Sequence, residues 1–171
     1  MKIQKTSKIA GIYIVLAFLA LAGAAYHTSA QSNDEKAVRD VLTLNTTAFA
    51  KNDLAALDKI WANEESVTVF ENGHANYGWA DYRNNHLAPE MKEFKNTKYG
   101  LSDMKVKIER RTAWATFKYS ISGDVNGRHF EGGGLGTAVL EKRGRNWLIV
   151  HWHTSAPRRA ASPTPTPAKT Q

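Results

Sequence analysis

The sequence predicts an α+β domain in which three helical segments precede a mainly antiparallel sheet. Up to residue 94, apolar residues recur mostly at the three- and four-residue spacing of helices, with one short strand-like run between them. After Lys95, apolar and polar residues alternate in four stretches that turn-forming residues separate. Helices grouped ahead of a run of strands favour this class over alternating helices and parallel strands.

The two ends of the 171-residue chain differ from the segment between them. Residues 1–30 combine a lysine-containing start, a long apolar run and small residues before Gln31, which predicts a secretory signal peptide; an uncleaved membrane anchor is the alternative. Residues 157–171 consist mainly of Pro, Thr, Ser and Ala, which predicts a disordered tail. The predicted folded domain is therefore residues 31–156.

Most of the basic charge lies in these ends. The chain has 23 Lys and Arg against 16 Asp and Glu, a formal net charge of +7. Three lysines of the signal segment and three basic residues of the tail leave 17 basic against 16 acidic residues in the domain, so no nucleic-acid partner is predicted. The absence of cysteine fits an exported protein, periplasmic or secreted, that is held together by its core and has no membrane contact after signal cleavage.

The stretch "SNDEKAVRDVLTLNTTAFAKND" predicts the first helix of the domain. Its apolar face carries Val38, Val41, Leu42 and Phe49. Asn45 lies in the middle of this stripe, where it is either a hydrogen-bonded buried amide or a polar group that lines a cavity.

Two more helical segments and one short strand complete the first half. "DLAALDKIWA" predicts a helix with Asp53 as its N-cap, "SVTVF" predicts a strand, and "ENGHANYG" predicts a turn-rich loop. "GWADYRNNHLAPEMKEF" predicts the third helical segment, in which Pro89 requires a break or a new start. One face of this segment carries Trp79, Tyr82, Arg83, His86 and Leu87.

The second half predicts a four-stranded antiparallel meander. Its strands are "MKVKIE", "AWATFKYSIS", "RHFEGGGLGTAVLE" and "NWLIVHWHTSAP". The glycines at 132, 133, 134 and 136 predict bulges, kinks or close backbone approach within the third of these strands. They do not predict a phosphate-binding loop, because no Gly-Lys-Ser/Thr ending and no helix follow them.

His151 and His153 are the most conspicuous candidates for a metal site. Two residues apart on a strand, they point the same way with Cα atoms about 6.6 Å apart. Catalytic zinc needs three protein ligands, and a third could come only from His129 or Glu131 on a matching face. No metal site is therefore predicted, and the two histidines are expected to hydrogen-bond to neighbouring strands or to a partner subunit.

His86 is the candidate general acid or base. It follows Tyr82 by about one helical turn, and an imidazole exchanges protons near neutral pH. The alternative is a hydrogen-bonded histidine of the core. The sequence shows no Ser-His-Asp arrangement, and without cysteine it has no thiol nucleophile.

Three stretches, "GWADYRNNHLAPEM", "TAWATFKYSISG" and "NWLIVHWHTSAP", resemble the SnoaL-like branch of the nuclear transport factor 2-like superfamily. The last is most similar to the final strand of the association domain of calcium/calmodulin-dependent kinase II. Over residues 33–156 the resemblance implies a cone-shaped, cystatin-like fold, with three helices packed in a curved sheet around a deep pocket. It also implies dimers or larger rings formed through the sheet. Members include isomerases, cyclases, dehydratases, ligand binders and oligomerising hubs, so the fold does not decide the function.

The activity-bearing residues of several relatives have no counterpart here. Ketosteroid isomerases of this fold use a tyrosine on the first helix and two aspartates on strands. The first helix here has no tyrosine, and Asp103 and Asp124 fall at an edge and in a turn. The acid/base aspartate of the cyclases is also unmatched. Thr154 occupies the position of a pocket arginine in the kinase association domain, which argues against carboxylate binding.

The same resemblance orients the last strand. It implies that Trp152 and Thr154 face the pocket. Strand alternation then turns His151 and His153 to the other face, toward a subunit interface.

We therefore expect an exported, homodimeric module with an apolar pocket for a small ligand and without a cofactor. The residues expected around this pocket are Asn45, Trp61, Tyr77, Tyr82, His86, Trp152 and Thr154. One alternative is an enzyme of the isomerase, cyclase or dehydratase kind, in which His86 carries the proton and Tyr82 or Asn45 stabilises negative charge on oxygen. The other alternative is a hub that only oligomerises.

Overall fold

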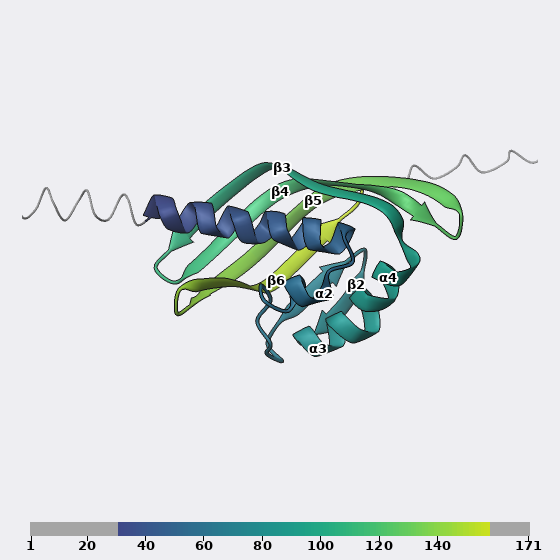
Figure 1. The fold of residues 1–171 in the computed structure, drawn as a ribbon. Coiled ribbons are helices and arrows are strands. Elements are labelled where there is room, and N and C mark those ends of the chain that lie inside the picture. The colour runs from purple at the N-terminus through teal and green to yellow at the C-terminus, as the bar shows by residue number, and fades with distance from the viewer. Residues whose placement is uncertain (1–30, 158–171) are drawn as a thin grey trace, which may run out of the picture.

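The computed structural model describes residues 31–157 of the chain. Its first element is a helix over residues 31–50 that lies along the sheet (Figure 1). Of the apolar stripe predicted for this helix, Val38, Leu42 and Phe49 are buried and Val41 is partly buried. The predicted signal peptide and tail lie outside the described residues, apart from Pro157. No helix within the described range is long and apolar enough to cross a membrane.

One six-stranded sheet curves around this helix in the order β2-β1-β6-β5-β4-β3 (Figure 1). Its strands are β1 (Thr68–Glu71), β2 (His74–Tyr77), β3 (Lys95–Glu109), β4 (Thr112–Val125), β5 (Arg128–Arg143) and β6 (Asn146–Ser155). Strands β3 to β6 are the predicted meander, and all neighbours are antiparallel except β1 and β6. The predicted α+β class and cone-shaped arrangement are confirmed.

The second helix is shorter than the sequence predicts. α2 (Leu54–Leu57) has Asp53 as its N-cap, whose Oδ1 accepts a hydrogen bond from the Ala56 amide at 2.9 Å. Residues 58–60 continue in turns, and the backbone of Ile60 and Ala62 then bonds to β6 instead of extending the helix. The Ile149 amide donates to the Ile60 carbonyl at 2.8 Å, and the Ala62 amide donates to the Ile149 carbonyl at 3.0 Å.

The segment predicted as a loop between strand and helix is in fact a β-hairpin. Asn72 and Gly73 have φ of 51° and 86°, as a two-residue turn with a left-handed backbone requires. In the paired strands Val69 lies opposite Asn76 and Glu71 lies opposite His74. The hairpin therefore turns alternate residues of β2 toward the interior.

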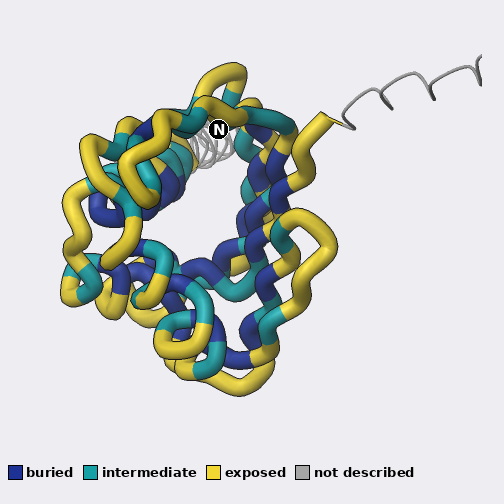
Figure 2. Tube along the Cα trace, turned by 90° about the vertical axis from the view of Figure 1, so that its right-hand side faces the viewer, coloured by how far each residue is buried: buried dark blue, intermediate teal, exposed yellow. Residues whose placement is uncertain are grey.

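The interior lies between the inner face of the sheet and the helices. Figure 2 shows the chain arranged around it, with buried positions alternating with exposed ones along the strands. In β6 the alternation buries Trp147, Ile149, Trp152 and Thr154. The irregular step between Ile149 and Trp152 coincides with a register shift at Val139 and Leu140 of the neighbouring β5.

The glycine cluster of β5 does not form the bulges that the sequence allowed. Pairing with β4 continues without a shift through this cluster. Besides the shift at Val139 and Leu140, the irregularities lie in β3, beside Asn96 and Asp103, which have φ of 52° and 51°. The glycines mark close approach. A Cβ on Gly134 would lie 1.9 Å from the backbone carbonyl oxygen of Ser155, whereas one on Gly132 would make an ordinary contact of 3.5 Å.

We expect Gly134→Ala to lower the free energy of unfolding by about 2 kcal/mol, because the methyl group would force β5 and β6 apart. Gly132→Ala, two residues away on the same strand, is the matched control and should stay within about 0.5 kcal/mol of wild type. Urea unfolding measures both. Equal losses in the two variants would show that this packing is not what requires glycine.

Candidate active site

A cavity of ≈ 810 Å³ lies between the helices and the inner face of the sheet. Aromatic side chains form one part of its lining: Phe49, Tyr82, Phe94, Tyr99, Tyr119, Phe130 and Trp152. Polar side chains form the other part: Asn45, Glu71, Asn72, His74, Asn76, Asn85, His86, Glu90, Glu93 and Thr154. The volume suits a small ligand, but the lining is more polar than the sequence predicted.

Five of the seven residues predicted around the pocket line this cavity: Asn45, Tyr82, His86, Trp152 and Thr154. Trp61 and Tyr77 do not. Trp61 is buried behind the lining and stacks on Trp79, with ring centroids 5.0 Å apart. Tyr77 is 65% exposed and contacts Phe70, because the β-hairpin turns it away from the interior.

The paired histidines of β6 lie outside this cavity. The Phe70 ring, also outside, contacts both His151 and His153, with centroid distances of 5.5 and 6.4 Å. His151 pairs with Val139, so His129 is ten residues away along β5. Within residues 31–157 no three His, Asp or Glu side chains are arranged to hold a metal ion.

His86 is carried by a widened helical turn. The helical segment runs as α3 (Trp79–Asp81), a π-helix η1 (Tyr82–Leu87) and α4 (Ala88–Glu93). Pro89 has no N–H to donate and falls in the first turn of α4, where none is needed. The Ala88 amide donates to the Arg83 carbonyl, a π-type bond. Such wide turns are frequent at functional sites.

The neighbours of His86 determine which of its two ring nitrogens carries a hydrogen in the neutral imidazole. Nδ2 of Asn76 donates to Oδ2 of Asp81 at 2.9 Å, which directs Oδ1 of the same amide toward His86. Nδ1 of His86 lies 2.8 Å from that oxygen and must therefore carry a hydrogen. In the neutral imidazole this leaves Nε2 as the unprotonated nitrogen. The hydrogen bond from Asn76 lowers the pKa of Asp81, which keeps this carboxylate ionised as the acceptor.

Two carboxylates flank Nε2 of His86. Oε1 of Glu90 lies 3.6 Å away and Oε2 of Glu71 lies 3.9 Å away. Burial raises the pKa of both carboxyl groups, an effect that the nearby His86 opposes. The Tyr82 hydroxyl donates to Oε2 of Glu71 at 3.1 Å, and its own pKa is raised by burial and by this carboxylate. The proton of Tyr82 is therefore engaged with Glu71 rather than free for a ligand.

We expect Glu71→Gln to stabilise the protein at pH 8. A carboxyl whose pKa is raised by folding contributes stability at low pH, and this contribution is lost as the pH rises through the raised pKa. The amide cannot ionise and still accepts from Tyr82. A gain of about 1 kcal/mol corresponds to about 4 °C in melting temperature. It should vanish near pH 4, and the exposed control Glu65→Gln should show no such trend; a destabilised Glu71→Gln at pH 8 would contradict this.

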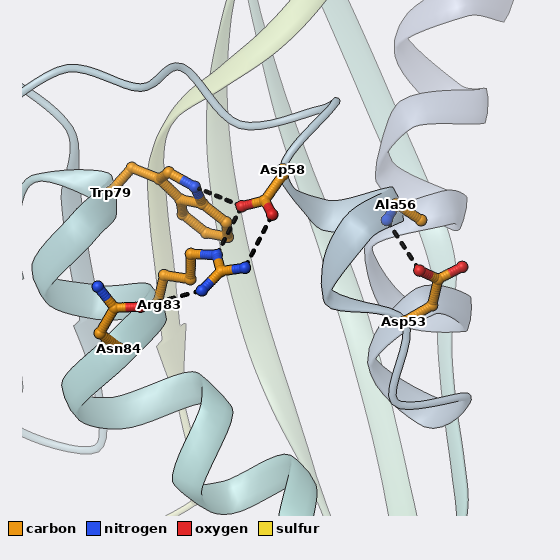
Figure 3. Close-up of polar contacts among 6 residues, drawn as sticks. All are labelled: Asp53, Ala56, Asp58, Trp79, Arg83 and Asn84. Carbon is orange, nitrogen blue, oxygen red and sulfur yellow. Dashed lines mark hydrogen bonds and ion pairs between the residues drawn. The ribbon is translucent and has the colours of Figure 1, made fainter.

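A clamp on the outside of the domain holds the His86 segment in place (Figure 3). Arg83 binds both carboxylate oxygens of Asp58, through Nε at 2.6 Å and Nη2 at 2.9 Å. The indole N–H of Trp79 donates to the same carboxylate at 3.0 Å. The hydrogen bonds from Arg83, which have the larger effect, and from Trp79 lower the pKa of Asp58. The clamp joins the helical segment to Asp58, which directly follows α2. Its arginine, Arg83, lies about one helical turn before His86.

Asn45 supplies a second oriented amide. The indole N–H of Trp61 donates to Oδ1 of Asn45 at 2.8 Å, which fixes the amide so that Nδ2 is the group left for other partners. Asn45 is only 8% exposed and lines the cavity. Its Nδ2 makes no hydrogen bond to any residue in the range 31–157 and is therefore a free donor at the cavity. Both interpretations of Asn45 from the sequence therefore apply. The amide oxygen is hydrogen-bonded in the core, and the amide nitrogen lines the cavity.

Sequence reasoning missed Glu71, Asn76 and Glu90. Glu71 and Asn76 lie in the stretch read as a loop, where the Asn-Gly pair was the signal for a hairpin that brings both inward. Glu90 lies four residues after His86, a spacing that places two side chains on one face of a helix.

Residues 38–159 match the SnoaL-like domain family. No curated protein shows significant similarity to the chain. Among solved structures, a nuclear transport factor 2-like superfamily protein of Salmonella enterica superposes with a TM-score of 0.71 at 18% identity, covering 75% of this chain and 94% of that one. Two others carry provisional activities in their descriptions. A Streptomyces avermitilis dehydratase has a TM-score of 0.69 at 18% identity, with 75% and 99% covered. A Shewanella frigidimarina ketosteroid isomerase has a TM-score of 0.60 at 22% identity, with 68% and 92% covered.

Proposed function

The chain belongs to the SnoaL-like domain family, and we propose that it is a proton-transfer enzyme of the isomerase or dehydratase kind. The fold of this family carries both binding proteins and enzymes, so the function must be argued from the cavity. The observation that carries this proposal is the geometry of His86. Its Nδ1 is held by Asn76, its Nε2 is unprotonated in the neutral ring, and two carboxylates flank Nε2 at 3.6 and 3.9 Å. A base oriented by a second group in this way is a recurrent catalytic arrangement.

The proposed reaction begins at a carbon next to a carbonyl group. Nε2 of His86 takes a proton from this carbon, and the electron pair of the C–H bond forms the C=C bond of an enolate. Glu71 and Glu90 stabilise the resulting imidazolium, and the free Nδ2 of Asn45 donates to the enolate oxygen. The imidazolium then returns the proton to another carbon, which is an isomerisation, or to a departing hydroxyl, which is a dehydration. No oxidant, reductant or metal enters this balance.

The test is hydrogen–deuterium exchange at carbon. Small ketones such as cyclohexanone, cyclohex-3-enone and 4-phenylbutan-2-one are incubated with purified protein in D₂O, and loss of the signal from the protons next to the carbonyl is followed by NMR. At least one ketone should exchange faster with wild type than with His86→Gln. Equal rates with both proteins for every ketone would overturn the proposal.

The second candidate function is binding of a small ligand without turnover, as the sequence led us to expect. The cavity volume of ≈ 810 Å³ and its aromatic walls favour it. In this case ketones that bind, as seen by saturation-transfer NMR, would show no accelerated exchange. The same experiment therefore separates the two functions.

Export and dimerisation belong to this proposal. The sequence of residues 1–30 and the absence of cysteine support export to the periplasm or the exterior. Apolar side chains on the outer face of the sheet support a homodimer. The cross-strand pairs Trp114–Val139, Val139–His151, His151–Thr68 and Thr68–Tyr77 form one row across that face. Leu135, 62% exposed, lies four residues from Val139 on the same face.

We expect Leu135→Glu to convert the homodimer to a monomer, because it would place a charge in the apolar face that the dimer buries. Sedimentation velocity at micromolar concentration measures the change. Leu44→Glu is the matched control, since Leu44 is 40% exposed on the first helix rather than on the sheet. A wild type that sediments as a monomer, or a Leu135→Glu variant that stays dimeric, would argue against this interface.

A further inference from the structure

The cavity has a lining of one charge sign. Glu71, Glu90 and Glu93 contribute carboxylates, and the lining within residues 31–157 contains no Lys or Arg. In this part of the chain, the lining side chains that can carry a positive charge are those of His74 and His86, when they are protonated. An anionic ligand would therefore meet repulsion and find no permanent positive partner there. This contrasts with the whole chain, whose formal charge is +7.

Another part of the lining, the aromatic wall, consists of aromatic rings that contact one another. Phe130 lies 5.0 Å from Phe94, Phe94 lies 6.0 Å from Phe49, and Phe49 lies 5.7 Å from Tyr99, centroid to centroid. Tyr99 in turn lies 6.1 Å from Tyr119. All of these residues line the cavity. Aromatic faces attract ammonium groups and also pack against apolar groups. The same wall can therefore contact both the charged part and the apolar part of an organic cation.

The Asn45 side chain presents a hydrogen-bond donor to the cavity. Nδ2 of Asn45, on a side chain more than nine-tenths buried, has no hydrogen-bond partner in the described part of the chain and borders the cavity. This N–H group reaches the cavity and can donate to an acceptor there. A ligand with a carbonyl or hydroxyl oxygen as well as an apolar body would supply that acceptor.

We propose that the cavity selects small organic cations, protonated amines with an apolar body and an oxygen acceptor, over carboxylates and phosphates. Such cations are the substrate class of the proposed enzyme. The proposal rests on the proposed function only because it assigns both to the same cavity. The ammonium group lies on the cavity side of Glu71 and Glu90, next to the position between them that Nε2 of His86 occupies. The apolar body packs on the aromatic wall, and the oxygen accepts from Asn45. Burial raises the pKa of both carboxyl groups, and a bound cation would favour their ionised forms.

Three probes of nearly equal shape test the charge preference: phenethylammonium, 2-phenylethanol and phenylacetate. Affinities are measured by calorimetry at pH 7 and low salt, on the full chain. Phenethylammonium should bind at least about tenfold more tightly than 2-phenylethanol, and phenylacetate should bind most weakly. Phenylacetate binding as tightly as phenethylammonium would overturn the proposal.

Charge-matched variants locate the effect. Glu71→Gln should weaken phenethylammonium binding about tenfold and leave the affinity for 2-phenylethanol within about twofold of wild type. Glu65→Gln removes the same charge from an exposed position outside the lining and should change neither affinity. Equal effects of both variants would mean that only the overall charge matters, which would overturn the site.

The two proposals fail separately. Selective binding of phenethylammonium without ketone exchange would leave a cation-binding cavity and overturn the enzyme. Ketone exchange that depends on His86, together with no preference for the cation, would leave the enzyme and overturn the substrate class.

Discussion

His86→Gln is expected to reduce protein-catalysed proton abstraction from carbon by about 10²- to 10³-fold. The change removes Nε2, the proposed proton acceptor, which lies between the two carboxylates, while glutamine keeps a side chain that can hydrogen-bond to Asn76. The measurement uses 5-nitrobenzisoxazole, whose base-catalysed ring opening breaks one C–H bond and releases a coloured nitrophenolate. This probe reports the base without requiring the natural substrate.

His74→Gln is the matched control for this rate. His74 also lines the cavity, but its side chain is exposed and it pairs across the hairpin with Glu71 rather than lying between two carboxylates. It should retain the wild-type rate within about threefold. Similar losses in both variants, or a wild-type rate no higher than that of buffer, would remove His86 from the role of base.

Trp152→Ala is expected to have the largest effect on stability, a loss of about 3–5 kcal/mol. Trp152 is 1% exposed, lines the cavity, and lies 4.9 Å from the Phe117 ring and 6.5 Å from the Trp61 ring, so its removal leaves a void in the cavity wall. Against a total stability of about 5–15 kcal/mol, this brings the domain close to unfolding at ordinary temperature. Guanidinium unfolding followed by circular dichroism measures the loss.

Trp114→Ala gives the comparison on the other face of the same sheet. Trp114 is 39% exposed, and the Lys107 ammonium lies 5.2 Å from its ring centroid. Its truncation should lower stability by about 1 kcal/mol or less. If the two tryptophans contributed equally, the assignment of inner and outer faces would be wrong.

The parts of the fold that the sequence predicted are those in which burial is periodic. The stripe around Val38 and Leu42 and the alternation of β4 and β6 follow directly from one buried face. The parts that escaped prediction lack this signal. β2 is an edge strand of mostly polar residues, and β3 is interrupted by irregularities beside Asn96 and Asp103, so neither β2 nor the first part of β3 shows regular alternation.

The site could be predicted only in part, for a related reason. Alternation in β6 was enough to separate Trp152 and Thr154 from His151 and His153. Tyr77 was misplaced because its orientation depends on the register of an unpredicted hairpin. Glu71 was missed because a lone carboxylate at a strand end resembles any surface acid until its neighbours are placed in space.

The hairpin and the helical segment that follows it have a consequence for how this protein could change over time. All the groups argued to handle a proton or to orient the base, Glu71, Asn76, Asp81, Tyr82, His86 and Glu90, fall within twenty consecutive residues, 71–90. Most of the aromatic wall comes from outside that stretch. Chemistry and ligand shape are therefore encoded in largely separate parts of the chain. Substitutions in the wall can alter which molecule fits while the reactive segment is inherited intact, and a graft of residues 71–90 onto another member of the fold would carry the reactive groups as one block.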